Sequence, residues 1–210
     1  ETIGSITYLS RNLEVLKKNT VAGFVLSCVG DNRDYSYVKT RYGNTITDKL
    51  LENTLKHLVP SHKAYSFYHR GSDERQFNAP GVDLPVCSVS RTKYGAYPEY
   101  HTSKDDLNLI SPEAFAGEYE VMTKSLLVLE NNFKYRINVF CEPQLGKRGL
   151  YPTISQKGSY SSIIALRDFI AYADGTNTLL DISELINIPA YELISIKDKL
   201  FENKLIDIVD

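Results

Sequence analysis

The segment that most constrains the fold is a nearly continuous apolar run from Val21 to Val29, with glycines at Gly23 and Gly30. A run of this kind is typical of a strand buried on both faces, so helices must cover both sides of its sheet. Directly upstream, apolar residues recur at the three- and four-residue steps of an amphipathic helix. They are Ile6, Leu9, Leu13 and Leu16.

Helical and strand patterns keep alternating along most of the chain. A leucine-rich helical stripe covers 50–58, and short strands are predicted at 64–68 and 85–89. The Ser-Pro-Glu sequence at 111–113 has the residue types of a helix start, with a capping hydroxyl, a proline and an acid in the first turn. The stripe predicted to be buried in that helix consists of Phe115, Tyr119, Met122, Leu126 and Leu129.

This alternation predicts an α/β domain at residues 1–140, with a sheet flanked by helices. Residues 141–158 are rich in proline and glycine and are predicted to form a linker. At 159–210, the order helix, short helix, turn, helix and strand predicts a small winged helix-turn-helix domain. Within it, residues 174–175 are predicted to turn and residues 206–209 to form the strand.

The composition is that of a folded globular chain, with 42% hydrophobic and 24% charged residues. No apolar run approaches the roughly 18 residues of a membrane span. The cysteines Cys28, Cys87 and Cys141 form no Cys-x-x-Cys pair, which favours reduced thiols and a cytoplasmic location, and the first two are predicted to be buried. Because the chain begins at Glu1 without a methionine or signal-like segment, we expect it to be a piece of a longer protein.

Two polar segments between the predicted elements, 71–75 and 97–106, carry the residues best suited to chemistry. Ligands of layered α/β sheets bind in loops beyond the carboxyl ends of the strands. His101, which lies amid carboxylates, is therefore a candidate metal ligand. The alternative for a single histidine is a capping or loop residue, and the residues alone leave both interpretations open.

Four short motifs stand out, namely Glu1-Thr2-Ile3-Gly4-Ser5, Leu26-Ser27-Cys28-Val29-Gly30, Gly71-Ser72-Asp73 and Tyr100-His101-Thr102. Over residues 1–137 they resemble the co-catalytic zinc aminopeptidases. The runs 72–77 and 79–85, together with the Tyr-His-Thr motif, also resemble a narrower bacterial aminopeptidase-like family with a C-terminal winged helix, some members of which are linked to polysaccharide biosynthesis. The resemblance implies part of a phosphorylase/hydrolase-like mixed sheet flanked by helices, because only the C-terminal part of such a protein would be present here.

The resemblance implies zinc as the cofactor and His101 as a metal ligand, since imidazole suits zinc. Glu1 corresponds to the general base of the family or, alternatively, to a second ligand. Two positions depart from the family pattern, because Thr2 stands where a metal-binding glutamate is expected and Ser27 where an aspartate is expected. We therefore predict one zinc ion instead of two.

The same resemblance assigns roles to neighbouring residues. Tyr100 would stabilise the oxyanion of a tetrahedral intermediate, with packing in a tyrosine-rich loop as its alternative. Asp105 would orient the metal-binding loop rather than bind the metal. Asp73, Glu74 and Arg75 are the predicted substrate-binding residues, with the carboxylates facing the ammonium group of the substrate. Their alternative is a salt bridge that orders the loop.

These expectations together define zinc-dependent hydrolysis of an N-terminal peptide or amide bond. The remaining ligands would come from the N-terminal half of the same protein, so the isolated chain is expected to bind zinc weakly and to lack peptidase activity. The alternative is a non-catalytic aminopeptidase-like protein that binds a peptide or a sugar-linked amine and uses its winged helix for docking.

The charge of the predicted winged helix argues against DNA as a partner. Residues 160–210 carry four Lys or Arg and nine Asp or Glu, a net charge of −5, whereas phosphate binding requires the opposite sign. The helix after Pro189 has no arginine to read guanine. We expect this domain to pack on the enzyme domain or to contact other proteins, and a homo-oligomer stays open.

Overall fold

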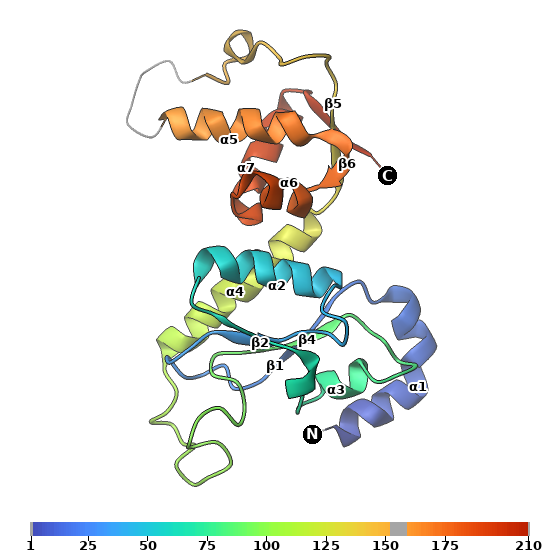
Figure 1. Ribbon diagram of the computed structural model, residues 1–210, viewed down its shortest axis with the longest axis vertical. Coiled ribbons are helices and arrows are strands. Elements are labelled where there is room, and N and C mark those ends of the chain that lie inside the picture. The colour runs from blue at the N-terminus through green and yellow to red at the C-terminus, as the bar shows by residue number, and fades with distance from the viewer. Residues whose placement is uncertain (1, 152–158, 210) are drawn as a thin grey trace. The chain divides into compact units, whose positions relative to one another are not determined.

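The computed structural model describes residues 2–151 and 159–209, which divide into two compact units, Glu1–Thr123 and Lys124–Asp210 (Figure 1). The first unit contains α1 (Ile3–Asn19), β1 (Gly23–Leu26), β2 (Ser36–Val38), α2 (Ile46–Leu58), β3 (Lys63–Tyr65), η1 (Phe67–His69), α3 (Glu74–Phe77) and β4 (Val86–Ser90). Helix α4 (Pro112–Glu130) crosses the division. The second unit contains β5 (Lys134–Ile137), η2 (Leu145–Arg148), α5 (Ser159–Tyr172), β6 (Asp174–Thr178), α6 (Leu179–Ile186), α7 (Ala190–Glu202) and β7 (Ile206–Val209).

The sheet of the first unit is mixed, with the strand order β1-β4-β2-β3. Strand β1 is parallel to β4, β4 is antiparallel to β2, and β2 is parallel to β3. Side chains alternate across β4, because Cys87 and Val89 pack with α2 and α4 while Val86 packs with α1 and α3. The predicted α/β fold with a mixed sheet between helices is confirmed (Figure 1).

The strands that are buried on both faces are the two inner strands, β4 and β2, in which every residue is buried. The apolar run Val21–Val29, predicted to be such a strand, contributes β1, whose residues are half-buried or, at Leu26, exposed. This prediction was wrong because β1 lies at an edge of the described sheet, whereas β4 lies inside it. Apolar composition alone does not separate the two positions.

Helix α4 begins where it was predicted, and the Ser111 hydroxyl accepts a hydrogen bond from the Ala114 N–H at 3.1 Å. The predicted buried stripe was wrong at Phe115, Tyr119 and Leu126, which are exposed, whereas Met122 is partly buried against the core. Apolar residues occur on more than one side of this helix, so helical spacing alone fits two faces. The face that is buried consists of Ala114, Glu118, Val121, Ser125 and Val128.

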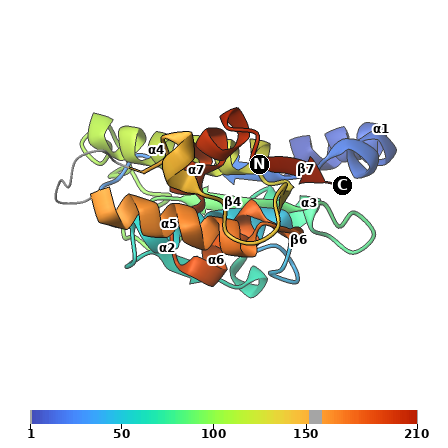
Figure 2. The same ribbon diagram turned by 90° about the horizontal axis from the view of Figure 1, so that it is seen from above.

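The second unit is built on an antiparallel sheet of order β6-β5-β7. Figure 2 shows α5 running beside α6, and the two helices are in contact. Residues 174–175, predicted to turn, instead begin β6, because β5 supplies a pairing partner that outweighs their weak strand propensity. Strand β7 confirms the predicted strand at 206–209.

The division between the units falls before the sequence-based boundary. Residues 134–137, assigned from the sequence to the first domain, form β5, the central strand of the second sheet. Within the predicted linker at 141–158, residues 145–148 form η2, and 152–158 lie outside the described residues. In the part of the chain that the structure describes, no helix combines the length and apolar character needed to cross a membrane.

Candidate functional site

Two loops meet beyond the carboxyl ends of β1 and β4. Because these strands are parallel neighbours, the segments that follow them leave the same edge of the sheet. The Ser27 N–H donates to the Val89 carbonyl at 3.1 Å, and the Arg91 N–H donates to the Cys28 carbonyl at 3.0 Å. The strand pairing therefore continues into the loops and brings 27–34 beside the segment that begins at Arg91.

Asp31 joins the two loops from a buried position. Its carboxylate accepts hydrogen bonds from the Thr92 N–H at 3.0 Å and the Thr92 hydroxyl at 2.6 Å. It also accepts the Arg33 N–H at 3.0 Å. A buried carboxylate needs such donors to offset its lost hydration, so Asp31 fixes how the loops meet.

A second link between the loops is the bidentate pair of Arg33 and Glu99, with both N···O distances at 2.8 Å. The hydrogen bonds to Arg33 lower the pKa of Glu99, and those to Glu99 raise the pKa of Arg33. The pair is accessible to solvent, so it orients the loop more than it stabilises the fold.

A small cavity of about 290 Å³ opens between the loops. The Tyr97 hydroxyl borders it and lies 3.4 Å from both the Cys28 Sγ and the Asp105 Oδ2. Burial, followed by the contact with Cys28, raises the pKa of Tyr97. The floor includes the apolar side chains of Leu109 and Phe115.

Cys28 is not the buried packing residue that the sequence predicted. It follows β1, has a left-handed backbone with φ 56°, and is half-buried at the cavity wall. Few residues other than glycine adopt this backbone, so the conformation is held by the surrounding loop contacts. Cys87, by contrast, is buried as predicted.

Three of the residues predicted for chemistry lie close to this cavity. The His101 ring stacks on Tyr100 with centroids 4.0 Å apart, and Tyr100 meets the edge of Tyr97 at 5.6 Å. Asp105 lines the cavity, whereas His101 is exposed with φ 58°. The structure thus brings Tyr100 and Asp105 against Tyr97, with His101 stacked on Tyr100. Tyr97 lies in the polar segment 97–106, but the sequence analysis gave it no role.

Glu74, predicted to bind substrate, is fully buried within its own loop. Its Oε1 accepts hydrogen bonds from the Gly71 N–H at 2.7 Å, the Ser72 N–H at 3.2 Å and the Tyr94 hydroxyl at 2.7 Å. This geometry supports loop ordering, the alternative left open by the sequence. The donors, however, are backbone groups and a phenol rather than an arginine.

Asp73 and Arg75 contact the start of α1. Asp73 Oδ1 accepts the Thr2 N–H at 2.7 Å and the Ser5 hydroxyl at 2.9 Å, and Arg75 Nη2 donates to the Thr2 hydroxyl at 3.3 Å. Both side chains therefore position the residue that follows Glu1. Glu1 itself, the predicted base or ligand, lies outside the described residues.

Lys93 is a further residue that the sequence analysis missed. Its ammonium donates to the Tyr94 carbonyl at 3.0 Å and lies 4.0 Å from the centroid of the Tyr94 ring. Burial lowers the pKa of Lys93, despite nearby Glu74 and Cys28. The rule that sites follow parallel strands could have indicated Cys28 and Asp31, but nothing in the sequence pattern distinguishes Lys93 or Tyr97 from their neighbours.

The described residues alone do not fit a zinc site. Across 2–151 and 159–209, no three His, Cys, Asp or Glu side chains converge closely enough to hold a metal ion. His101 supplies one imidazole, whereas zinc sites use at least three protein ligands. Further ligands would have to come from Glu1 or from sequence beyond this chain.

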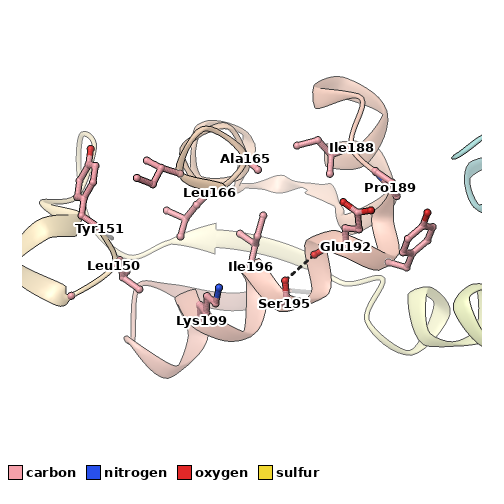
Figure 3. Close-up of a pocket in the computed structure, with 13 residues that line it drawn as sticks. Leu150, Tyr151, Ala165, Leu166, Ile188, Pro189, Glu192, Ser195, Ile196 and Lys199 are labelled. Atoms are coloured by element: carbon pink, nitrogen blue, oxygen red, sulfur yellow. Dashed lines mark hydrogen bonds between the residues drawn. The ribbon is translucent and has the colours of Figure 1, made fainter. Parts of the chain in front are cut away.

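A larger cavity of about 850 Å³ lies in the second unit, between α5, α7 and the segment at 149–151 (Figure 3). Its described walls are mostly apolar, with Leu166, Ile188 and Ile196 pointing toward it. None of the residues predicted for chemistry lines it. Its polar lining residues include Glu192, Ser195 and Lys199, to which the sequence analysis gave no chemical role.

Residues 1–132, more than half of the chain, match the family described as "Domain of unknown function (DUF4910)". This chain belongs to that family. Residues 134–208 match a family described as winged helix-turn-helix, which confirms the predicted C-terminal fold. This match begins at β5 rather than at the boundary expected from the sequence.

Two relatives from Clostridium acetobutylicum resemble the whole chain. A "Putative polysaccharide biosynthesis protein with aminopeptidase-like domain" is 39% identical over 211 residues, which cover 100% of this chain and 48% of that protein. The crystal structure of a "putative peptidase" is 37% identical, with a TM-score of 0.88, covering 100% of this chain and 46% of that one. The chain thus spans about half the length of these relatives, and they confirm the aminopeptidase-like resemblance.

An aminopeptidase from Aneurinibacillus sp. strain AM-1 is more distant, at 22% identity and a TM-score of 0.49. The similarity covers 60% of this chain and 29% of that one. A likeness this weak says nothing about the site. The zinc cofactor and the catalytic roles of individual residues stay predictions.

Proposed function

We propose that the chain forms the C-terminal half of a zinc-dependent hydrolase that cleaves an N-terminal peptide or amide bond. The observation that carries the proposal is that Tyr97 and Asp105 line a cavity at the carboxyl ends of two parallel strands, with Tyr100 against Tyr97 and His101 stacked on Tyr100. Loops in this position are where layered α/β proteins bind ligands. The aminopeptidase-like names of the relatives support the same reaction class.

In this proposal His101 provides a metal ligand from an exposed position, and Glu1 serves as base or ligand. Zinc would supply a Lewis acid and an activated water. The aromatic stack holds the His101 ring from one side, which limits its orientations. Tyr97 presents a protonated hydroxyl to the cavity, a suitable donor to a developing oxyanion, and is an alternative to Tyr100 in that role.

The proposal also gives the 71–75 loop a supporting role. Asp73 and Arg75 hold Thr2, and so they fix the backbone beside Glu1. A direct contact of Asp73 with a substrate ammonium remains part of the proposal, whereas Glu74 acts through the loop it orders. Peptide or amide substrates, a cytoplasmic location and a context in polysaccharide biosynthesis are proposed with it.

A non-catalytic binding protein is the second candidate. One observation favours it: the Thr2 hydroxyl, at a position where the zinc aminopeptidases have a metal-binding glutamate, is engaged by Arg75. In that case the cavity would bind a peptide or sugar-linked amine, and the acidic winged helix would dock another protein rather than DNA.

The two candidates are separated by zinc content and by hydrolysis of aminoacyl p-nitroanilides, measured on the protein at its full natural length. The hydrolase proposal predicts tightly held zinc and activity that a chelator removes and added zinc restores. The isolated 210-residue chain should have neither property. A full-length protein that holds no zinc and cleaves none of these substrates would refute the hydrolase and leave the binding protein.

A further inference from the structure

Three arginines line one depression of about 500 Å³ on the first unit, away from the cavity described above. Arg41 follows β2, Arg70 follows η1, and Arg75 lies in α3. Arg70 and Arg75 are close in sequence, and Arg41 reaches them because β2 pairs with β3 and the Arg41 N–H donates to Asn78, just after α3, at 3.2 Å. The described lining contains no acidic residue, and its remaining wall includes Phe67, Ala79 and Pro80.

The hydrogen-bonding capacity of these arginines is largely unused. Arg41 forms an ion pair with Asp83, but its Nε is buried and has no hydrogen-bond partner among the described residues. Arg70 makes a long contact of 3.5 Å to the Phe67 carbonyl. In the described parts of the chain, neither Arg70 nor Arg75 is paired with a carboxylate.

Like charges gathered in this way repel one another, and an anion would relieve the repulsion. Each guanidinium presents five N–H donors in a planar fork that matches carboxylate or phosphate oxygens. A carboxylate has two oxygens, whereas a phosphoryl group has three terminal oxygens and a charge near −2. Three separate forks therefore fit a phosphoryl group better than a carboxylate.

The size and walls of the depression indicate what the ligand carries besides its phosphoryl group. Its volume lies in the range of about 300–1,000 Å³ that is typical of small-molecule sites, and so it exceeds the needs of a bare phosphate ion. The apolar side of the wall, formed by Phe67, Ala79 and Pro80, can receive an apolar or ring-shaped group. Arg70 lies over the Phe67 ring at 5.0 Å, which joins the charged and apolar parts of the wall.

We propose that Arg41, Arg70 and Arg75 form a binding site for a phosphate monoester, with its phosphoryl group among the guanidinium groups and its organic part against Phe67 and Pro80. The proposal goes beyond the hydrolase function and does not depend on it, because binding is measured without turnover. Arg75 also contacts Thr2, so a bound phosphoryl group would lie near the start of α1.

The test is isothermal titration calorimetry at pH 7.5 and low ionic strength, in a buffer without phosphate or sulfate. The probes are phenyl phosphate and its two halves, inorganic phosphate and phenol. Phenyl phosphate should bind more tightly than inorganic phosphate, and phenol should not bind. No heat of binding with millimolar phenyl phosphate would overturn the proposal, and equal affinity for phenyl phosphate and inorganic phosphate would overturn its organic part.

Arginine variants test whether phenyl phosphate binds in this depression. Charge-assisted hydrogen bonds are stronger than neutral ones, so Arg70→Gln and Arg75→Gln should each weaken phenyl phosphate binding about 10-fold. Both side chains are exposed, so the variants should fold, which thermal melting checks. The matched control is Arg11→Gln, an exposed arginine on α1 that does not line the depression. Unchanged affinity in both variants, or an equal loss in the control, would show that the anion binds elsewhere.

Discussion

The loops at 71–75 and 97–105 are both polar, yet they use their side chains in opposite ways. In the first loop, Glu74 is fully buried and satisfies donors of its own segment. In the second, His101 and Asp105 are exposed and Tyr100 is half-buried. This loop is held by Glu99, which pairs with Arg33 of the neighbouring loop, while Asp31 holds Thr92 just upstream. A site needs accessible side chains on a fixed backbone. Glu74 therefore makes the first loop a scaffold, its neighbours Asp73 and Arg75 keep their proposed binding roles, and the 97–105 loop is the candidate site.

The largest loss of stability is expected from a substitution that breaks the scaffold loop at Glu74. Glu74→Ala leaves the Gly71 and Ser72 N–H groups and the Tyr94 hydroxyl without their acceptor, which should lower the free energy of unfolding by about 3 kcal/mol. Urea denaturation followed by circular dichroism measures the change. Glu14→Ala, at an exposed position on α1, should stay within about 0.5 kcal/mol. Equal stability of the two variants would mean that Glu74 does not order the loop.

Glu118 is a buried carboxylate that contrasts with Glu74, because both its oxygens are buried without a hydrogen-bond partner among the described residues. Burial raises its pKa from 4.5 to about 7, although Arg91 opposes the shift. The folded state therefore binds the proton more tightly than the unfolded state, so stability falls as the pH rises from about 4.5 through about 7.

Replacing Glu118 by glutamine should remove this loss. At pH 8, Glu118→Gln should be more stable than the natural chain by up to about 3 kcal/mol, with little difference near pH 4. Urea denaturation at several pH values measures this, with Glu113→Gln, exposed in the same helix, as the control. A destabilising effect at pH 8 would show that the Glu118 carboxylate has a charged or donating partner after all.

An intermediate loss of stability is expected at Asp31, which joins the two loops beside the candidate site. Asp31→Ala removes three hydrogen bonds to Thr92 and Arg33 and should cost about 2 kcal/mol. The same change should reduce activity of the full-length protein, because it releases Thr92 and the backbone of Arg33, whose side chain holds Glu99 of the 97–105 loop. Intact activity together with lowered stability would show that Asp31 stabilises the fold without positioning the candidate site.

The smallest stability effect is expected inside the cavity. Tyr97→Phe removes a hydroxyl whose two contacts are weak, because the Cys28 sulfur is a weak acceptor and 3.4 Å is long for a bond to the Asp105 carboxylate, so the cost should be about 1 kcal/mol or less. Thermal melting measures it, with Tyr42→Phe as an exposed tyrosine control. A loss of stability as large as that in Glu74→Ala would show that Tyr97 supports the fold rather than the candidate site.

The local elements could be predicted from the sequence, but their exposure could not. The start of α4 follows from the Ser-Pro-Glu sequence at 111–113, and α2 follows from its leucine stripe. The buried face of α4 could not be predicted because it carries Glu118 and Ser125, whereas the stripe that begins at Phe115 is wholly apolar and yet largely exposed. Which stripe packs against the sheet is decided by tertiary contacts.

The same limit applies to the candidate site. The position of His101 beside a loop cluster could be predicted, because the motif lies beyond a strand and between polar segments. The loop-ordering contacts of Glu74 could not be predicted, because a glutamate that binds its own loop and one that binds a substrate look the same in a sequence. The place of Tyr97 at the cavity could not be predicted either. The left-handed backbone at Cys28 is also set by contacts with segments far along the chain.

The most direct test of the contrast between scaffold and site is His101→Ala in the protein at its full natural length. The account predicts an unchanged melting temperature, because His101 is exposed, and a fall in kcat/KM of at least about 100-fold toward aminoacyl p-nitroanilides, with loss of bound zinc. His69→Ala, an exposed histidine outside the cavity, should leave both properties unchanged. Full activity and full zinc content in His101→Ala would contradict the account.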